Sequence, residues 1–257
     1  MNQLLILYAS FVIFLVFGAL FLHLLPRLGT VGKACSAWFC SAPGADLAIG
    51  YFTFITPVIG VFYLGWRGLL IGFAAEYTTM LLWILGHELA HMNKWQGEKI
   101  HRTMSRLFGG VRNHLAVWIT SLAVPIFWAV RFGELIVYPP LTWLIRLPKY
   151  DAKDWVNVSR HKFSGLVGYD LIWCLYCDWM TGVWSLGTEM LRNVESFWCP
   201  IRFYDDKKCE NCKQDFPDVD NGWVCENQGI EQVTALLESK YKDTQESSWF
   251  GHPNRKD

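Results

Sequence analysis

The chain has 257 residues, of which 52% are hydrophobic and 16% aromatic, and it carries no formal net charge at pH 7. Charged residues make up only 18% of the chain, against about 25% in soluble domains, so the composition argues against an ordinary soluble domain. Because the apolar residues are also concentrated in long runs, the sequence predicts an integral membrane protein.

Several apolar runs are long enough to cross a hydrocarbon core of about 30 Å. No Lys or Arg precedes the first run and no clean small-residue cleavage site follows it, which favours an anchor over a cleaved signal peptide. One apolar run is short and interrupted by Pro139 and Pro140, so a re-entrant or interfacial segment suits it better. The predicted spans are 4–25, 45–66, 68–92, 113–130 and 163–186, the last weakened by Asp170 and Asp178, and the interrupted run is 135–145.

The predicted fold class is therefore all-α: a polytopic (multi-pass) integral membrane protein of four to six helices. We expect a transmembrane helical domain over residues 1–190 and a polar C-terminal tail with a cysteine cluster over 191–257. Within this tail, apolar residues recur at helical spacing and predict a short helix. They are Ile230, Val233, Leu237 and Tyr241.

The third predicted span ends in His87-Glu88-Leu89-Ala90-His91, an HExxH motif. On a helix, two histidines four residues apart project from one face, so both imidazoles can bind one metal ion. The glutamate between them can polarise a water molecule on that metal. A catalytic zinc also needs a third protein ligand and an open position for water. Glu189 is our first candidate for that ligand, ahead of Asp178 and Asp170.

The stretch from Ile84 to His91 resembles the zinc-binding helix of membrane-embedded gluzincins and site-2-type proteases. In those families the two histidines bind zinc and the glutamate is the general base, which is what the resemblance implies for His87, His91 and Glu88. Membrane-bound gluzincins take the third ligand from a later Glu-x-x-x-Asp helix, which residues 189–193 match only in part because Asn stands in place of Asp. The Asn/Asp-Pro-Asp-Gly context of site-2 proteases is absent. The resemblance implies a zinc-dependent metallopeptidase.

Other interpretations of this motif stay open. A His-Glu-His group at the end of a helix can also be a polar cap at the membrane surface, bonded to headgroups or to a partner subunit. Two Glu-x-x-His pairs are present, as in di-iron bundles, but those bundles place the pairs on different helices. If the helix continued past the motif, one polar stripe would include Glu76, His87, His91, Glu98 and His101. We expect Glu76 to have a partner, because a carboxylate at that depth is expensive in a bilayer.

Four cysteines of the tail follow the pattern C-x9-C-x2-C-x12-C, at Cys199, Cys209, Cys212 and Cys225. Four thiolates can enclose a second, structural zinc ion, and the CxxC pair supplies two ligands at a suitable spacing. Two disulfides are the alternative, which an oxidising compartment would favour.

The sequence leaves two functions open. The first is a zinc metallopeptidase with Glu88 as its catalytic base. The second is a non-catalytic accessory or assembly subunit of a larger membrane complex, with a metal-bound or disulfide-stabilised tail. The expected partners are the lipid bilayer and other membrane subunits. We expect no nucleic acid, because the basic segment 94–112 is short, has apolar residues interleaved, and suits the lipid headgroups better.

Overall fold

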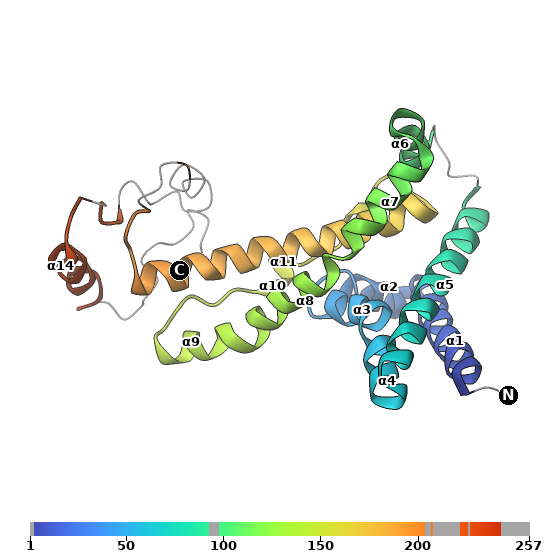
Figure 1. Ribbon diagram of the computed structural model, residues 1–257, viewed down its shortest axis with the longest axis horizontal. Helices are drawn as coiled ribbons and strands as arrows, with labels where there is room; N and C mark the ends of the chain where they lie inside the picture. Colours follow the sequence, from blue (N-terminus) through green and yellow to red (C-terminus); the bar gives the residue numbers. More distant parts are fainter. Residues whose placement is uncertain (1–2, 93–97, 204–206, 208–221, 226, 243–257) are drawn as a thin grey trace. The chain divides into compact units, whose positions relative to one another are not determined.

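The computed structural model describes residues 3–92, 98–203, 207, 222–225 and 227–242 (Figure 1). Regular secondary structure in these residues is helical, with only two isolated β-bridges, between Ser41 and Asn157 and between Ile201 and Val224. The predicted all-α class is therefore confirmed.

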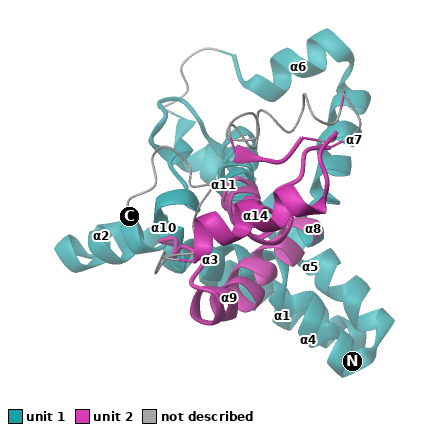
Figure 2. Ribbon diagram, turned by 90° about the vertical axis from the view of Figure 1, so that its left-hand side faces the viewer, with its two compact units in different colours: residues 1–125, 152–182 teal, residues 126–151, 183–257 magenta. Residues whose placement is uncertain are grey.

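The chain forms two compact units, coloured separately in Figure 2. Unit 1 contains residues 1–125 and 152–182, and unit 2 contains residues 126–151 and 183–257. Helix α11 (Gly168–Trp198) contributes its first half to unit 1 and its second half to unit 2. It also passes without interruption through residues 190 and 191, where the sequence places the start of the tail. That domain boundary remains a prediction.

Unit 1 is built from helices before residue 125 and, after the chain returns to it at residue 152, from two short helices and the start of α11. They are α1 (Gln3–Leu24), η1 (Leu25–Arg27), α2 (Gly29–Trp38), α3 (Gly44–Thr53), α4 (Ile55–Leu64), α5 (Trp66–Ala90), α6 (Ile100–Phe108), α7 (Gly110–Ser121), α10 (Ala152–Trp155) and η4 (Arg160–Lys162).

Helices α4 and α5 form a tight hairpin whose turn is Gly65, at φ +59°. The two helices approach so closely at Gly60 and Gly68 that a Cβ atom on either glycine would overlap the backbone of the other. The hairpin also supplies the expected partner for the half-buried carboxylate of Glu76 in α5, since the Thr56 hydroxyl donates to Glu76 Oε1 at 2.9 Å.

Helix α1 packs along α5 and runs in the same direction. Near the start of α1, the Tyr8 hydroxyl bonds Thr78 Oγ1 at 2.8 Å, and at its end the His23 ring meets His87 edge-on, with ring centroids 6.3 Å apart. Phe11 and Leu15 of α1 are buried with Ala75 of α5 in the core between them. The chain must therefore return between the two helices, and α3 and α4 form that return path.

Among the described residues, three helical stretches are long and apolar enough to cross a membrane: Gln3–Arg27, Trp66–Ala90 and Gly110–Leu144. Helices α3 and α4, bent by 44° at their junction, would add a fourth if they form one broken span. The third stretch corrects the expectation that Pro139 and Pro140 interrupt the apolar run. The π-helical segment η3 (Gly133–Val137) leads directly into α9 (Tyr138–Leu144), and proline is tolerated in the first turn of a helix. The predicted span 163–186 is not among these candidates.

Unit 2 contains most of α8 (Val124–Phe132), then η3, α9, the second half of α11 and α14 (Ile230–Tyr241). Helix α14 confirms the predicted tail helix, and its Val233 is buried. Charged and polar side chains fill much of the interior of this unit. The buried ones are Arg131, Glu134, Glu189, Arg192, Asn193 and Ser196.

Candidate functional site

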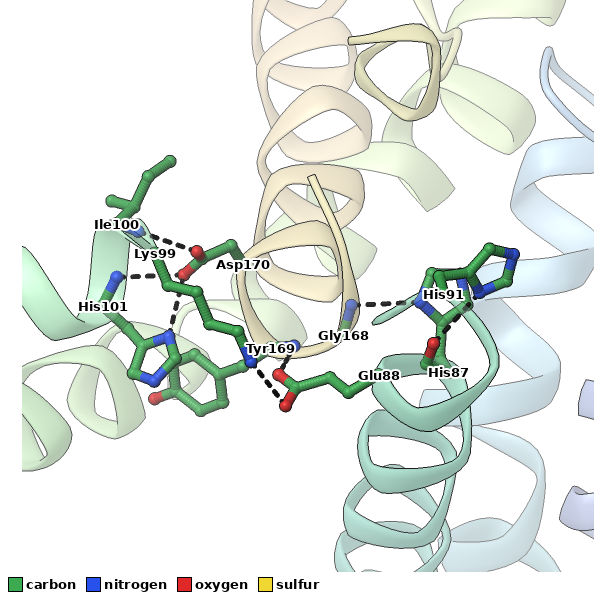
Figure 3. Close-up of polar contacts among 9 residues, drawn as sticks. All are labelled: His87, Glu88, His91, Lys99, Ile100, His101, Gly168, Tyr169 and Asp170. Atoms are coloured by element: carbon green, nitrogen blue, oxygen red, sulfur yellow. Dashed lines mark hydrogen bonds and ion pairs between the residues drawn. The ribbon is translucent and has the colours of Figure 1, made fainter. Parts of the chain in front are cut away.

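The HExxH motif lies at the C-terminal end of α5, where three helix ends of unit 1 meet (Figure 3). The other two are the N-terminal ends of α6 and α11. The first N–H groups of a helix have no acceptor within the helix and need partners from elsewhere. We call the group formed by His87, Glu88, Lys99, His101 and Asp170 the polar junction.

Side chains of α5 cap the start of α11. The backbone N–H of Gly168 donates to His87 Nδ1 at 3.1 Å, and that of Tyr169 donates to Glu88 Oε1 at 3.4 Å. A carboxylate is also favoured there by the positive end of the helix dipole. Gly168 adopts φ +52°, and a Cβ atom on it would collide with the Glu88 side chain. Glycine at this position therefore provides both the turn and the room for the carboxylate.

The carboxylate of Glu88 also pairs with the Lys99 ammonium, at 2.6 Å from Oε2. Both side chains are largely shielded, with 9% of Lys99 and 20% of Glu88 exposed. Lys99 is the residue that immediately precedes α6, so this ion pair joins the end of α5 to the start of α6.

Helix α11 in turn caps α6 through Asp170. Its two carboxylate oxygens accept the backbone N–H groups of Ile100 at 2.8 Å and His101 at 3.0 Å. His101 Nδ1 is 3.2 Å from the same carboxylate, which can only accept, so the proton of the neutral ring is on Nδ1. Asp170 was a candidate third zinc ligand in the sequence, and the structure uses it as a helix cap.

The two histidines of the motif lie on one side of α5, and Glu88 points to the other side, towards Lys99 (Figure 3). His91 Nδ1 donates to the carbonyl oxygen of His87 at 3.0 Å, and the two rings stack with centroids 4.2 Å apart. The ring of His23 approaches His91 edge-on at 5.8 Å. Sequence reasoning did not include His23 in the site, although it was the only histidine in the first apolar run.

As their side chains lie, His87 and Glu88 do not present ligand and base to a zinc ion. His87 accepts a hydrogen bond at Nδ1, which leaves the proton of the neutral ring on Nε2, whereas zinc needs a lone pair. Glu88 is directed away from the histidines and is paired with Lys99. Within the described residues, no three His, Cys, Asp or Glu side chains form a group that could hold a metal ion.

The other predicted ligands have protein partners. In unit 2, Glu189 accepts the Tyr150 hydroxyl at 3.1 Å and pairs with Arg192 at 3.3 Å. In unit 1, Asp178 accepts the backbone N–H groups of Ser159 and Arg160 at 2.8 Å and 2.7 Å. The Glu189 carboxylate is therefore used in an ion pair, and the Asp178 carboxylate in binding backbone N–H groups.

The extended polar stripe is also corrected. Helix α5 ends at Ala90 and α6 begins at Ile100, so His87 and His101 do not share one continuous helix. Glu98 forms an exposed ion pair with Arg106 at 2.8 Å, and His101 belongs to the polar junction. The two Glu-x-x-His pairs thus have separate structural roles.

In the tail, Cys199 is an exposed free thiol and Cys225 is half-buried and free, while Cys209 and Cys212 lie outside the described residues. The structural zinc in the tail therefore stays a prediction, and two disulfides stay its alternative.

A cleft of about 350 Å³ lies beside the junction and is lined by side chains of α5, α6, α7 and α11. Glu88 is common to the cleft and the HExxH motif. Burial raises the pKa of the Tyr169 phenol, whose hydroxyl can donate a hydrogen bond in the cleft. The lining residues are Ile84, Glu88, His101, Ser105, Gly110, Asn113, His114 and Tyr169.

Comparison of the chain with known protein families, with curated proteins and with solved structures finds no match. The assignment of a function therefore depends on the geometry described above.

Proposed function

We propose that this chain is a multi-pass integral membrane protein that serves as a non-catalytic subunit of a larger membrane complex. The observation that carries the proposal is the polar junction. Glu88 pairs with Lys99 and caps α11, while the His87 ring accepts the N–H of Gly168. A zinc peptidase would need the His87 ring to bind the metal and Glu88 to activate the water molecule. In this chain both side chains are instead engaged in joining three helix ends.

A face of α11 in unit 2 fits a partner helix. Trp184, Leu191 and Trp198 recur every seven residues, and each is more than half exposed, at 55%, 59% and 54%. At 3.6 residues per turn they fall within about 40° of arc. Apolar residues at a seven-residue repeat are typical of helix pairs, and α11 is not among the helices apolar enough to cross a membrane. A protein partner covers this face better than lipid does.

The partner test truncates the three side chains together and follows the size of the native complex by blue-native electrophoresis of membranes extracted in mild detergent. Because a large interface anchor contributes about 2 kcal/mol, each truncation to Ala should weaken the complex about 30-fold. The matched control truncates Ile13, Phe17 and Leu20, which are exposed on the candidate span of α1. The subunit role is rejected if native and variant chains both migrate as the bare 29.7 kDa protein.

The metal test compares zinc per chain in the purified native protein with zinc in His91→Ala and Cys212→Ala. We expect His91→Ala to leave the zinc content unchanged. Stoichiometric zinc that His91→Ala removes and Cys212→Ala does not would instead assign a zinc ion to the HExxH motif and favour the metallopeptidase interpretation. The converse pattern would assign zinc to the tail cysteines.

A second candidate function, acid–base chemistry in the cleft, is favoured by the pairing of His101 with Asp170. With Nδ1–H directed at the carboxylate, the Nε2 lone pair of His101 can accept a proton, as a general base must. The test offers fluorogenic ester, amide and phosphate-ester substrates to the reconstituted chain. His101→Gln should abolish turnover, and Asp170→Asn should lower kcat with little change in KM. His161→Gln, outside the cleft lining, is the control; no turnover of any substrate removes this candidate.

A further inference from the structure

Helix α6 connects two candidate spans, since it lies between the end of α5 and the stretch that begins at Gly110. It is amphipathic, and its apolar side chains are exposed: Leu107 is 66% and Phe108 is 60% exposed. Together with Ile100 and Met104 they cover about 100° of the helix surface. An exposed apolar stripe of this kind at the end of a span is typical of a helix that lies in the membrane interface.

The opposite side of α6 is basic. Arg102 and Arg106 lie about half a turn of the helix away from the apolar stripe, and Arg112 follows in the first turn of α7. Arg106 pairs with Glu98, and both are exposed, at 67% and 45%. In the part of the chain that the structure describes, the guanidinium groups of Arg102 and Arg112 form no ion pair.

The third side of α6 is fixed to the rest of unit 1. Asp170 caps its start, and Asn113 Nδ2 of α7 bonds the carbonyl oxygen of His101 at 3.3 Å and the Ser105 hydroxyl at 3.1 Å. These contacts hold α6 by its polar junction face, so the apolar stripe and the arginines remain available on the other faces.

We propose that α6 binds the phosphate headgroups of anionic phospholipids. The apolar stripe enters the acyl boundary, while Arg102, Arg106 and Arg112 reach the phosphates, which guanidinium groups bind through paired hydrogen bonds. Basic residues next to a span gain about 1 kcal/mol each from an anionic leaflet. The inference rests on the membrane location proposed above and is independent of the subunit role.

The experiment places the full-length protein in nanodiscs of phosphatidylcholine alone or of an equal mixture with phosphatidylglycerol, and native mass spectrometry counts the lipids retained. The native chain should retain phosphatidylglycerol in preference. Arg102→Gln with Arg112→Gln should reduce that preference about fivefold per guanidinium, or about 25-fold together. The control, Lys162→Gln with Lys242→Gln, removes the same charge at the end of η4 and just after α14, neither of which adjoins a candidate span in the sequence.

Hydrogen exchange of the native chain provides a second measurement that needs no variant. Backbone exchange over residues 100–108 should slow in the anionic discs and return to its phosphatidylcholine rate at high salt, because salt screens the charges. An unchanged lipid preference in the double variant, an equal loss in the control, or exchange that ignores lipid charge would each overturn the headgroup proposal. If an acidic peptide added to the nanodiscs were retained by the chain in place of phosphatidylglycerol, the headgroup proposal would be overturned as well. A chain that does not remain in the nanodiscs would also refute the membrane location.

Discussion

Unit 1 and unit 2 use charged residues in opposite ways. In the polar junction of unit 1, carboxylates accept backbone N–H groups from helices far away in sequence, as Asp170 does for Ile100. In unit 2, a group that we call the polar row, Tyr150, Glu189, Arg192 and Asn193, is bonded largely through side chains, and Glu189 pairs with Arg192 only three residues away. The first arrangement joins separate helices, whereas the second neutralises charge within α11 and bonds that helix to Tyr150, which lies in the segment after α9.

The two regions also differ in burial. Only 1% of the Arg192 side chain and 6% of Glu189 are exposed, which is less than for either partner of the Glu88–Lys99 pair. A buried charge that loses its partner is far more costly than a partly shielded one, because water cannot replace the lost interaction. Substitutions in the polar row should therefore destabilise the fold more than equivalent ones in the junction.

The largest effect is expected from Glu189→Ala, which leaves the Arg192 guanidinium without its carboxylate. Breaking such a pair costs about 3–5 kcal/mol in the free energy of unfolding. Chemical denaturation in detergent micelles measures the loss. The control replaces both partners, Glu189→Leu with Arg192→Met, and should recover most of the stability. A loss below about 1 kcal/mol in the single variant would contradict the buried pair.

Gly168→Ala should have the next largest effect. Its positive φ alone costs an alanine about 1–2 kcal/mol, and the new Cβ would also displace Glu88 from the start of α11. Gly29→Ala is the matched control, because Gly29 adopts φ +71° and nothing lies within 4 Å of the position that an alanine methyl group would occupy. Thermal unfolding measures the loss of stability in both variants. The difference between the two losses is the contribution of the Glu88 contact. Equal losses would mean that Glu88 does not need this glycine.

Asp170→Asn should cost about 1 kcal/mol, because an amide offers one acceptor oxygen where the carboxylate caps two N–H groups of α6. Hydrogen exchange at the start of α6 should speed up, while exchange in α4 stays unchanged. Asp154→Asn, an exposed aspartate in α10, serves as the control. If α6 exchanges at its native rate in Asp170→Asn, the cap does not hold that helix.

The smallest effect is expected from Glu98→Gln. Its pair with Arg106 is exposed to water, so its contribution should be below about 0.5 kcal/mol and should vanish at high salt. The same denaturation series measures it beside Arg106→Gln. A loss comparable to that of Asp170→Asn would show that this surface pair is part of the junction.

Much of the helical framework was predictable from local sequence. The apolar runs located the three stretches able to cross a membrane, and the spacing of Ile230, Val233, Leu237 and Tyr241 located α14. Glu76 was expected to need a partner, and Thr56 provides it. The proline pair was misjudged because the penalty of proline applies inside a helix, whereas α9 begins at Tyr138, just before it.

The site was less predictable, because the HExxH pattern specifies which side chains share a helix face and says nothing about what they meet. His87 and His91 do lie on one side of α5, as their spacing requires. The role of Glu88 depends on Lys99 and Tyr169, and no spacing rule relates α5 to α11. The sequence did contain a signal for His23. It is a histidine near the end of the first apolar run, just as His87 and His91 lie near the end of the third.

By itself, the sequence determined the helices and their apolar character, since both depend on residues within a few turns of each other. Only the tertiary structure decided which carboxylate caps which helix. An unpaired N–H group at a helix end accepts any suitable oxygen or nitrogen within about 3 Å, regardless of its distance along the chain. For this reason the motif could be read from the sequence, whereas its use as a junction could not.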